Sequence, residues 1–315
     1  MTGDGRISGC VVQIGFLLNL FFYSVCETRA ETDPGRIYAA LDRENIAYNC
    51  EQLARAASQA IIKAIDSKAS IVSQVPKKDL EKKLSVISAH KWPEGIRYIE
   101  LAGFYSDWAS VTESLTDLYD KDAVGMIMDL RGAGGADIEA VDNVSGVFLQ
   151  EGTELFKVTD SHDKLVELHT AAKTDTSDFE IPLIILVDEN TRGASEFFTA
   201  ALKGRKRCLV MGCSTQGDSA IRERISLSEK AELYIATKRV VPVSGVQFDP
   251  GGVQPDIVVS DRSGGGSGKF PSSSEKKKIS KKEQLDRDLM ELTKDDPLMG
   301  RAFDVLLGLR ALGNQ

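Results

Sequence analysis

The sequence predicts an α/β domain built around a mainly parallel β-sheet. Three continuous apolar runs, VGMIMDL (124–130), PLIILVD (182–188) and RCLVMG (207–212), are typical of strands that are buried on both faces. The segments that follow the first two runs, IEAVDNVSGVFL (138–149) and SEFFTAAL (195–202), have helical patterns. Strands that alternate with helices form parallel sheets with helical crossovers, which gives the predicted class.

Further elements are predicted on either side of this alternation. Apolar residues recur at spacings of three and four from about 35 to 66, which indicates a helical segment, and a polar, Lys-rich stretch (67–92) follows it. The other predicted elements are a strand over 96–104, a helix over 110–122, a strand-rich segment over 231–243, a closing segment over 251–259 and a final helix over 296–312 with an apolar face.

Residues 1–30 have the layout of a signal peptide. Arg6 precedes the apolar run VVQIGFLLNLFFYSV (11–25), and Thr28 and Ala30 supply the small residues that a cleavage site needs. The apolar run is shorter than the roughly 20 residues of a membrane-spanning helix. We therefore expect export to the periplasm or the extracellular space. The alternative is a membrane anchor formed by an uncleaved signal segment.

Composition and charge exclude several functions. The chain has 315 residues, of which 42% are hydrophobic and 27% charged, as in an ordinary globular protein. Its formal net charge of -8 argues against general binding to nucleic acid, and the Lys run at 276–282 is typical of a solvated tail. The three histidines, at 90, 162 and 169, are far apart in the sequence. We therefore predict no metal site, no cofactor and no Ser-His-Asp triad.

Five segments are expected along the chain. They are a signal peptide (1–30), an N-terminal helical segment with a linker (31–95), a core (96–260), a flexible linker that contains SGGGSGKFPSSS (261–283) and a C-terminal helical tail (284–315).

Four motifs in the core carry a resemblance to a known family. They are VGMIMDLRGAGGADIEAV (124–141), PLIILVDENTRGASEFFTAAL (182–202), RCLVMGCSTQGDSAIRERISLS (207–228) and GVQPDIVV (252–259). Their order and spacing resemble those of the tail-specific, or C-terminal-processing, serine peptidases. The upstream segment AIIKAIDSKAS (60–70) is similar to a helical segment of the same family. The resemblance implies that the core has a crotonase-like or ClpP-like, mainly parallel sheet.

The resemblance also implies where a catalytic dyad would lie. In the family a neutral Lys takes the proton of a Ser hydroxyl, and backbone amides bind the oxyanion. Family members carry a turn like Ser-Ala-Ser-Ala-Ser-Glu, with the nucleophile three residues before the Glu. Glu196 matches that Glu, so the nucleophile position is Gly193, and the general-base position is Asp218. Two supporting polar positions of the family fall on Gly204 and Arg222.

Other parts of the family site are retained. Gly134, Gly135 and the amide of Ala194 match the family's oxyanion-hole region, although Ala133 replaces a family Pro and a glycine pair is also a common turn. Ser195 is the nearest hydroxyl, and its place before Glu196 favours a helix N-cap. The alternative is an active site that uses Ser195 as a displaced nucleophile.

A glycine cannot attack a carbonyl, and the loss of both members of a nucleophile–base pair removes most of the rate. The segment between the N-terminal helices and the core is also too short for the PDZ module that family members carry. We therefore predict an exported, catalytically inactive protein that binds a polypeptide or a protein C-terminus, with self-association or partner docking through 296–312. The alternative is an active endopeptidase that processes protein C-termini.

Overall fold

The computed structural model describes most of the chain, in two compact units, Met1–Ser67 and Lys68–Gln315. The described residues are 34–44, 49–73, 85–174, 179–228, 231–243, 246–259 and 296–313. The predicted signal peptide (1–30) and the predicted linker (261–283) lie outside these ranges.

The first unit contains two helices, α2 (Pro34–Arg43) and α3 (Cys50–Ile65). Asn49 begins α3, since its side-chain oxygen accepts a hydrogen bond from the amide of Gln52 at 3.1 Å. The predicted helical character of 35–66 is thus confirmed for the described residues.

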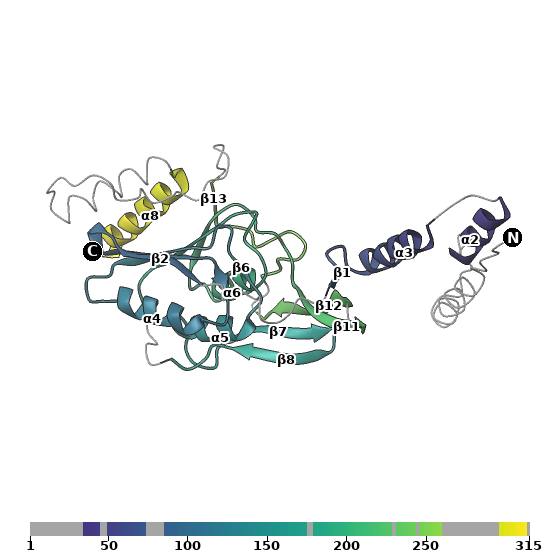
Figure 1. The fold of residues 1–315 in the computed structure, drawn as a ribbon. Helices are drawn as coiled ribbons and strands as arrows, with labels where there is room; N and C mark the ends of the chain where they lie inside the picture. Colours follow the sequence, from purple (N-terminus) through teal and green to yellow (C-terminus); the bar gives the residue numbers. More distant parts are fainter. Residues whose placement is uncertain are drawn as a thin grey trace, which may run out of the picture. The chain divides into compact units, whose positions relative to one another are not determined.

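The larger unit is built on a six-stranded sheet, in the order β13-β10-β9-β5-β3-β2 (Figure 1). All neighbouring strands are parallel except β2 and β3, which are antiparallel. The strands are β2 (Val86–Lys91), β3 (Ile96–Leu101), β5 (Gly125–Asp129), β9 (Leu183–Val187), β10 (Leu209–Gly212) and β13 (Ile257–Val258). A mainly parallel sheet with helical crossovers confirms the predicted class.

A second sheet of five strands is antiparallel throughout. Its strands are β1 (Ser70–Ser73), β7 (Glu154–Asp160), β8 (Leu165–Thr170), β11 (Ala220–Ser228) and β12 (Ala231–Pro242). Of these, only β12 was predicted from the sequence. A short pair, β4 (Gly103–Phe104) and β6 (Gly134–Gly135), lies beside the candidate site described below. The stretch 67–92 also contains β1 and β2, which its polar composition did not reveal.

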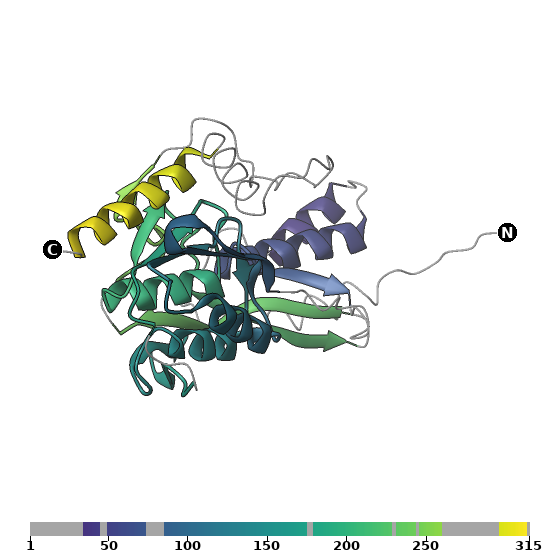
Figure 2. The ribbon, with the colours of Figure 1, turned by 90° about the vertical axis from the view of Figure 1, so that its left-hand side faces the viewer.

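Helices cover both faces of the six-stranded sheet (Figure 2). On one face pack α4 (Trp108–Leu118), α5 (Ile138–Gly146) and α6 (Ala194–Gly204), together with strands β7 and β12 of the second sheet. On the other face packs α8 (Pro297–Gly313), which confirms the predicted final helix. A single-turn 3-10 helix, η2 (Pro93–Gly95), precedes β3. Within the described ranges no helix is both long enough and apolar enough to cross a membrane.

Strand alternation separates these two layers of core. Met128 and Ile185 face the layer that contains α6, whereas Ile127 and Ile184 face α8. Because both faces of β5 and β9 are buried, these strands read as continuous apolar runs in the sequence.

Candidate active-site region

The turn between β9 and α6 carries Gly193, the predicted nucleophile position. Gly193 has φ +59° and ψ −128° and is the N-cap of α6. A Cβ atom built on Gly193 would lie 2.6 Å from the carbonyl oxygen of Gly135, which is closer than real contacts allow. Only glycine adopts this backbone conformation without strain, so the absence of a side chain fits the local structure.

The carboxylate of Glu196 joins this turn to the loop that carries Asp218. Glu196 is fully buried and accepts hydrogen bonds from the amide of Gly193 (3.1 Å), the hydroxyl of Thr215 (2.6 Å) and the amide of Gly217 (2.6 Å). It also accepts from the amide of Asp218 at 3.3 Å. Burial raises the pKa of Glu196, and these four donors oppose that rise because they favour the charged carboxylate. Gly193 and Asp218, the predicted nucleophile and general-base positions, are therefore neighbours in the fold.

Asp218 is bound by two cations. Its carboxylate lies 2.7 Å from Nζ of Lys68 and 2.8 Å from Nη1 of Arg222, and its side chain is 16% exposed. Burial opposes ionisation, but the hydrogen bonds from Arg222 and Lys68 hold the pKa of Asp218 below its usual value. Asp218 is consequently a charged hydrogen-bond acceptor, and the matched position 193 offers it no hydroxyl.

Ser195 lies inside the protein. It is 0% exposed, and its hydroxyl donates to the carbonyl oxygen of Gly134 at 2.8 Å. The expected N-cap role of Ser195 is wrong, because α6 begins one residue earlier, at Ala194, and Gly193 is its N-cap. The Gly193 carbonyl accepts the amides of Glu196 (2.8 Å) and Phe197 (3.1 Å).

The glycine pair of β6 lies directly against this turn. Gly134 donates its amide to the carbonyl oxygen of Ala102 at 3.0 Å, and Ala133 accepts the amide of Arg192 at 2.9 Å. Gly135 has φ +104°, and a Cβ there would lie 2.2 Å from the carbonyl oxygen of Phe104, so only glycine fits. Ala194 is fully buried. The structure thus brings the three predicted oxyanion-hole residues to one place. The Gly134 amide is bonded to Ala102, the residue between β3 and β4.

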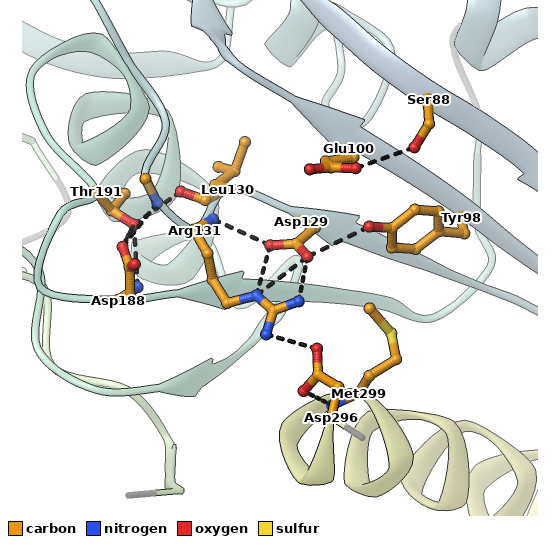
Figure 3. A network of polar contacts seen from close by, with 11 residues as sticks. Ser88, Tyr98, Glu100, Asp129, Leu130, Arg131, Asp188, Thr191, Asp296 and Met299 are labelled. Atoms are coloured by element: carbon orange, nitrogen blue, oxygen red, sulfur yellow. Dashed lines mark hydrogen bonds and ion pairs between the residues drawn. The ribbon is translucent and has the colours of Figure 1, made fainter. Parts of the chain in front are cut away.

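Two polar residues outside the predicted site positions connect the ends of β5 and β9 (Figure 3). Asp188 accepts the amide of Gly132 at 2.8 Å, and the hydroxyl of Thr191 donates to the carbonyl oxygen of Leu130 at 2.8 Å. The signal for this arrangement is the Asp-Glu-Asn-Thr composition of the turn, since such side chains bond to nearby backbone. Lys68 was also missed, because it contacts Asp218 across a sequence separation of 150 residues.

Of the two supporting family positions, one has no polar side chain and the other pairs with Asp218. Gly204 is the last residue of α6, and Arg222 is used by Asp218. In the part of the chain that the structure describes, no group of three or more His, Cys, Asp or Glu side chains could hold a metal ion.

A strand–turn–helix beside a glycine turn, on an α/β sheet, is an arrangement in which many hydrolases hold a nucleophile. Residues 95–259 match Peptidase family S41, and the chain belongs to this family. The predicted resemblance to the tail-specific peptidases is therefore confirmed.

Two curated relatives are C-terminal-processing enzymes by name. The chain is 30% identical over 161 residues to the C-terminal processing peptidase, chloroplastic, of Tetradesmus obliquus, covering 51% of this chain and 34% of that protein. It is 28% identical over 167 residues to the carboxyl-terminal-processing protease of a Synechocystis species, covering 53% and 38%. The chain thus spans about a third of the length of these relatives.

Two solved structures share the fold. A lipoprotein from Streptococcus agalactiae superposes with a TM-score of 0.55 and 18% identity, covering 82% of this chain and 95% of that one. A peptidase-like protein from Parabacteroides merdae superposes with a TM-score of 0.52 and 17% identity, covering 74% and 83%.

Proposed function

We propose that this chain is an exported S41-fold protein that binds polypeptides and does not cleave them. One observation carries the proposal: the two positions that match the dyad hold a glycine in a glycine-only conformation and an ion-paired aspartate. Neither residue can generate an attacking alkoxide, since Gly193 has no side chain and Asp218 has no hydroxyl partner there.

The arrangement of Ser195 supports the same proposal. A displaced nucleophile must reach a substrate carbonyl, but the Ser195 hydroxyl is fully buried and donates to Gly134. The Ser195 hydroxyl donates its proton to a backbone carbonyl, which cannot act as a general base.

The binding half of the proposal rests on the family. The relatives named above act on protein C-termini by name, and extended polypeptide is the ligand for which clefts of such sheets are suited. Export is proposed from the apolar run at 11–25, and self-association through 296–312 remains a separate prediction.

The test compares the native chain with variants that rebuild the dyad, using a disordered protein as substrate. Gly193→Ser with Asp218→Lys alone would leave the new lysine beside Lys68 and Arg222. A four-fold variant that adds Lys68→Ala and Arg222→Gln removes this repulsion, and glutamine restores the polar residue of the family at 222.

We expect no cleavage by the native chain and weak cleavage by the four-fold variant, because a side chain at position 193 strains the turn. Native cleavage that disappears in Ser195→Ala would overturn the proposal in favour of the displaced nucleophile. Binding is measured separately, by fluorescence anisotropy of a labelled disordered polypeptide with the native chain.

A further inference from the structure

The C-terminal helix α8 lies on the face of the six-stranded sheet that faces away from α4, α5 and α6 (Figure 1). Its buried side chains are Leu298, Met299, Ala302 and Leu306. Leu306 packs so closely on β5 that a Cβ atom on Gly125 would lie 2.7 Å from it. At the far end, Arg310 lies 2.9 Å from the carboxylate of Glu94. Docking of α8 is thus specified along its length.

One carboxylate at the start of α8 has two partners. Asp296 is 5% exposed, and its Oδ1 accepts the amide of Met299 at 3.0 Å, which caps the helix. Its Oδ2 lies 2.7 Å from Nη1 of Arg131 (Figure 3). The residue that begins α8 therefore also binds a side chain of the main body.

Arg131 belongs to the turn that leads from β5 to the glycine pair. Arg131 donates hydrogen bonds to the carboxylate of Asp129 from Nε at 3.0 Å and from Nη2 at 2.6 Å. The third nitrogen, Nη1, is left to pair with Asp296. Guanidinium groups that bind carboxylates in this forked way are fixed in orientation as well as in position. The Arg131 side chain is 15% exposed, so water replaces either carboxylate poorly.

The backbone of this turn is bonded to the candidate site. The amide of Gly132 donates to Asp188, and the carbonyl oxygen of Ala133 accepts the amide of Arg192, the residue before Gly193. A continuous set of polar contacts therefore runs from Asp296 through Arg131 and its turn to the turn at 188–193.

We propose that Asp296 is a positioning residue of the candidate site: docking of α8 orients Arg131 and the 131–135 turn, and so favours polypeptide binding there. The binding part of this inference rests on the proposed function, whereas the positioning part does not. Because coupling is reciprocal, a polypeptide in the site would also favour docking of α8.

The alternative is that α8 only buries apolar surface. In that case, removing the charge of Asp296 would change the stability of the whole domain and leave the 131–135 turn no more mobile than the rest. The two possibilities differ in where protection is lost, which hydrogen–deuterium exchange measures directly.

The test uses the full chain and two readouts. Trp92 is 5% exposed and belongs to the core under α8, and its ring stacks on that of Tyr98 with centroids 4.5 Å apart. In a Trp108→Phe background, the fluorescence of Trp92 therefore reports the docking of α8. Hydrogen–deuterium exchange of the Gly132 and Arg192 amides reports whether the hydrogen bonds of the 131–135 turn are intact. The variants are Asp296→Asn, Leu306→Asp, which undocks α8 with Asp296 intact, and the control Asp304→Asn, on the exposed side of α8.

For Asp296→Asn and Leu306→Asp we expect exchange at the Gly132 and Arg192 amides to rise about 10-fold or more beyond the change at β9 amides, in line with the loss of a buried ion pair. Asp304→Asn should leave exchange unchanged. Unchanged or uniformly raised exchange in both variants would overturn the inference, whatever Trp92 reports.

Polypeptide affinity is measured on the same variants and is expected to fall by a similar factor. If the native chain binds no polypeptide, the proposed function and the coupling fail, and the exchange data still decide the positioning role of Asp296.

Discussion

The carboxylate of Glu196 accepts a hydrogen bond from the amide of Gly193 at 3.1 Å, so the predicted nucleophile position is fixed by the glutamate three residues later. The same carboxylate binds the amides of Gly217 and Asp218. The geometry that relates the two dyad positions thus depends on a side chain that is itself no member of the dyad. The same carboxylate also satisfies buried backbone amides, which is a structural role independent of catalysis.

Glu196→Gln should therefore destabilise the domain. The NH2 group of glutamine would face at least one N–H or O–H group that now donates to the carboxylate, so that hydrogen bond is lost. The negative charge is lost as well. We expect the free energy of unfolding to fall by about 2–3 kcal/mol, as for hydrogen bonds to a buried charged group. Urea denaturation followed by circular dichroism measures the change.

The matched control for this substitution is Glu189→Gln, in the same turn. Glu189 is exposed, and its carboxylate is 3.4 Å from the thiol of Cys213. It should change stability by less than about 0.5 kcal/mol. Equal effects of the two substitutions would mean that Glu196 does not join the two loops as described.

Gly193→Ala tests whether the turn tolerates any side chain. A Cβ atom meets the Gly135 carbonyl at 2.6 Å, and φ of +59° is unfavourable for alanine. We expect a loss of about 1–3 kcal/mol in the free energy of unfolding. Gly308→Ala is the control, because Gly308 lies in α8 with open space around its Cβ position. That change should stabilise by about 0.5–1 kcal/mol. A neutral Gly193→Ala would show that position 193 can accept a serine without cost.

Ser195→Ala separates a structural hydroxyl from a catalytic one. The substitution removes the hydrogen bond to the Gly134 carbonyl and should lower the free energy of unfolding by about 1 kcal/mol. Polypeptide binding should be unchanged, because the hydroxyl is buried. Thermal unfolding and binding of a labelled disordered polypeptide are measured on the same preparation. A loss of binding with unchanged stability would contradict the structural role.

The sequence predicted best the elements that are buried on both sides. Strand β9 and helix α6 are almost entirely buried, so their apolar residues form clear patterns. In contrast, β8 and β11 are largely exposed, and their buried and exposed residues do not alternate along the strand. Their pairing depends on partners distant in the sequence, which local propensity does not contain.

The candidate site divides in the same way. The positions 193 and 218 followed from motif spacing, and the structure brings them together. Lys68 and Asp296 come from segments outside the four core motifs. Lys68 forms an ion pair with Asp218, and Asp296 forms one with Arg131. The sequence around a single lysine or aspartate does not indicate which distant side chain it pairs with.

His169 provides a contact whose strength depends on pH. Its Nδ1 lies 2.8 Å from Asp142 on α5 and its Nε2 lies 3.2 Å from Glu167, while the ring stacks on Phe156 with centroids 5.0 Å apart. The hydrogen bond with Asp142 raises the pKa of His169 above its ordinary value of 6.5. The charged imidazolium, which donates from both nitrogens, is therefore the form that the folded state favours.

Because the pKa of His169 is higher in the folded than in the unfolded chain, its contribution to stability is present below about pH 6.5 and is lost as pH rises through the folded pKa. His169→Gln should consequently lower the free energy of unfolding by about 0.5–1 kcal/mol more at pH 6 than at pH 9, as for a partly exposed ion pair. The control is His162→Gln, which replaces an exposed histidine in the turn between β7 and β8. Urea denaturation of the three proteins at the two pH values measures the difference. A His169→Gln effect that is equal at pH 6 and pH 9 would mean that the Asp142–His169 contact does not depend on the imidazolium charge.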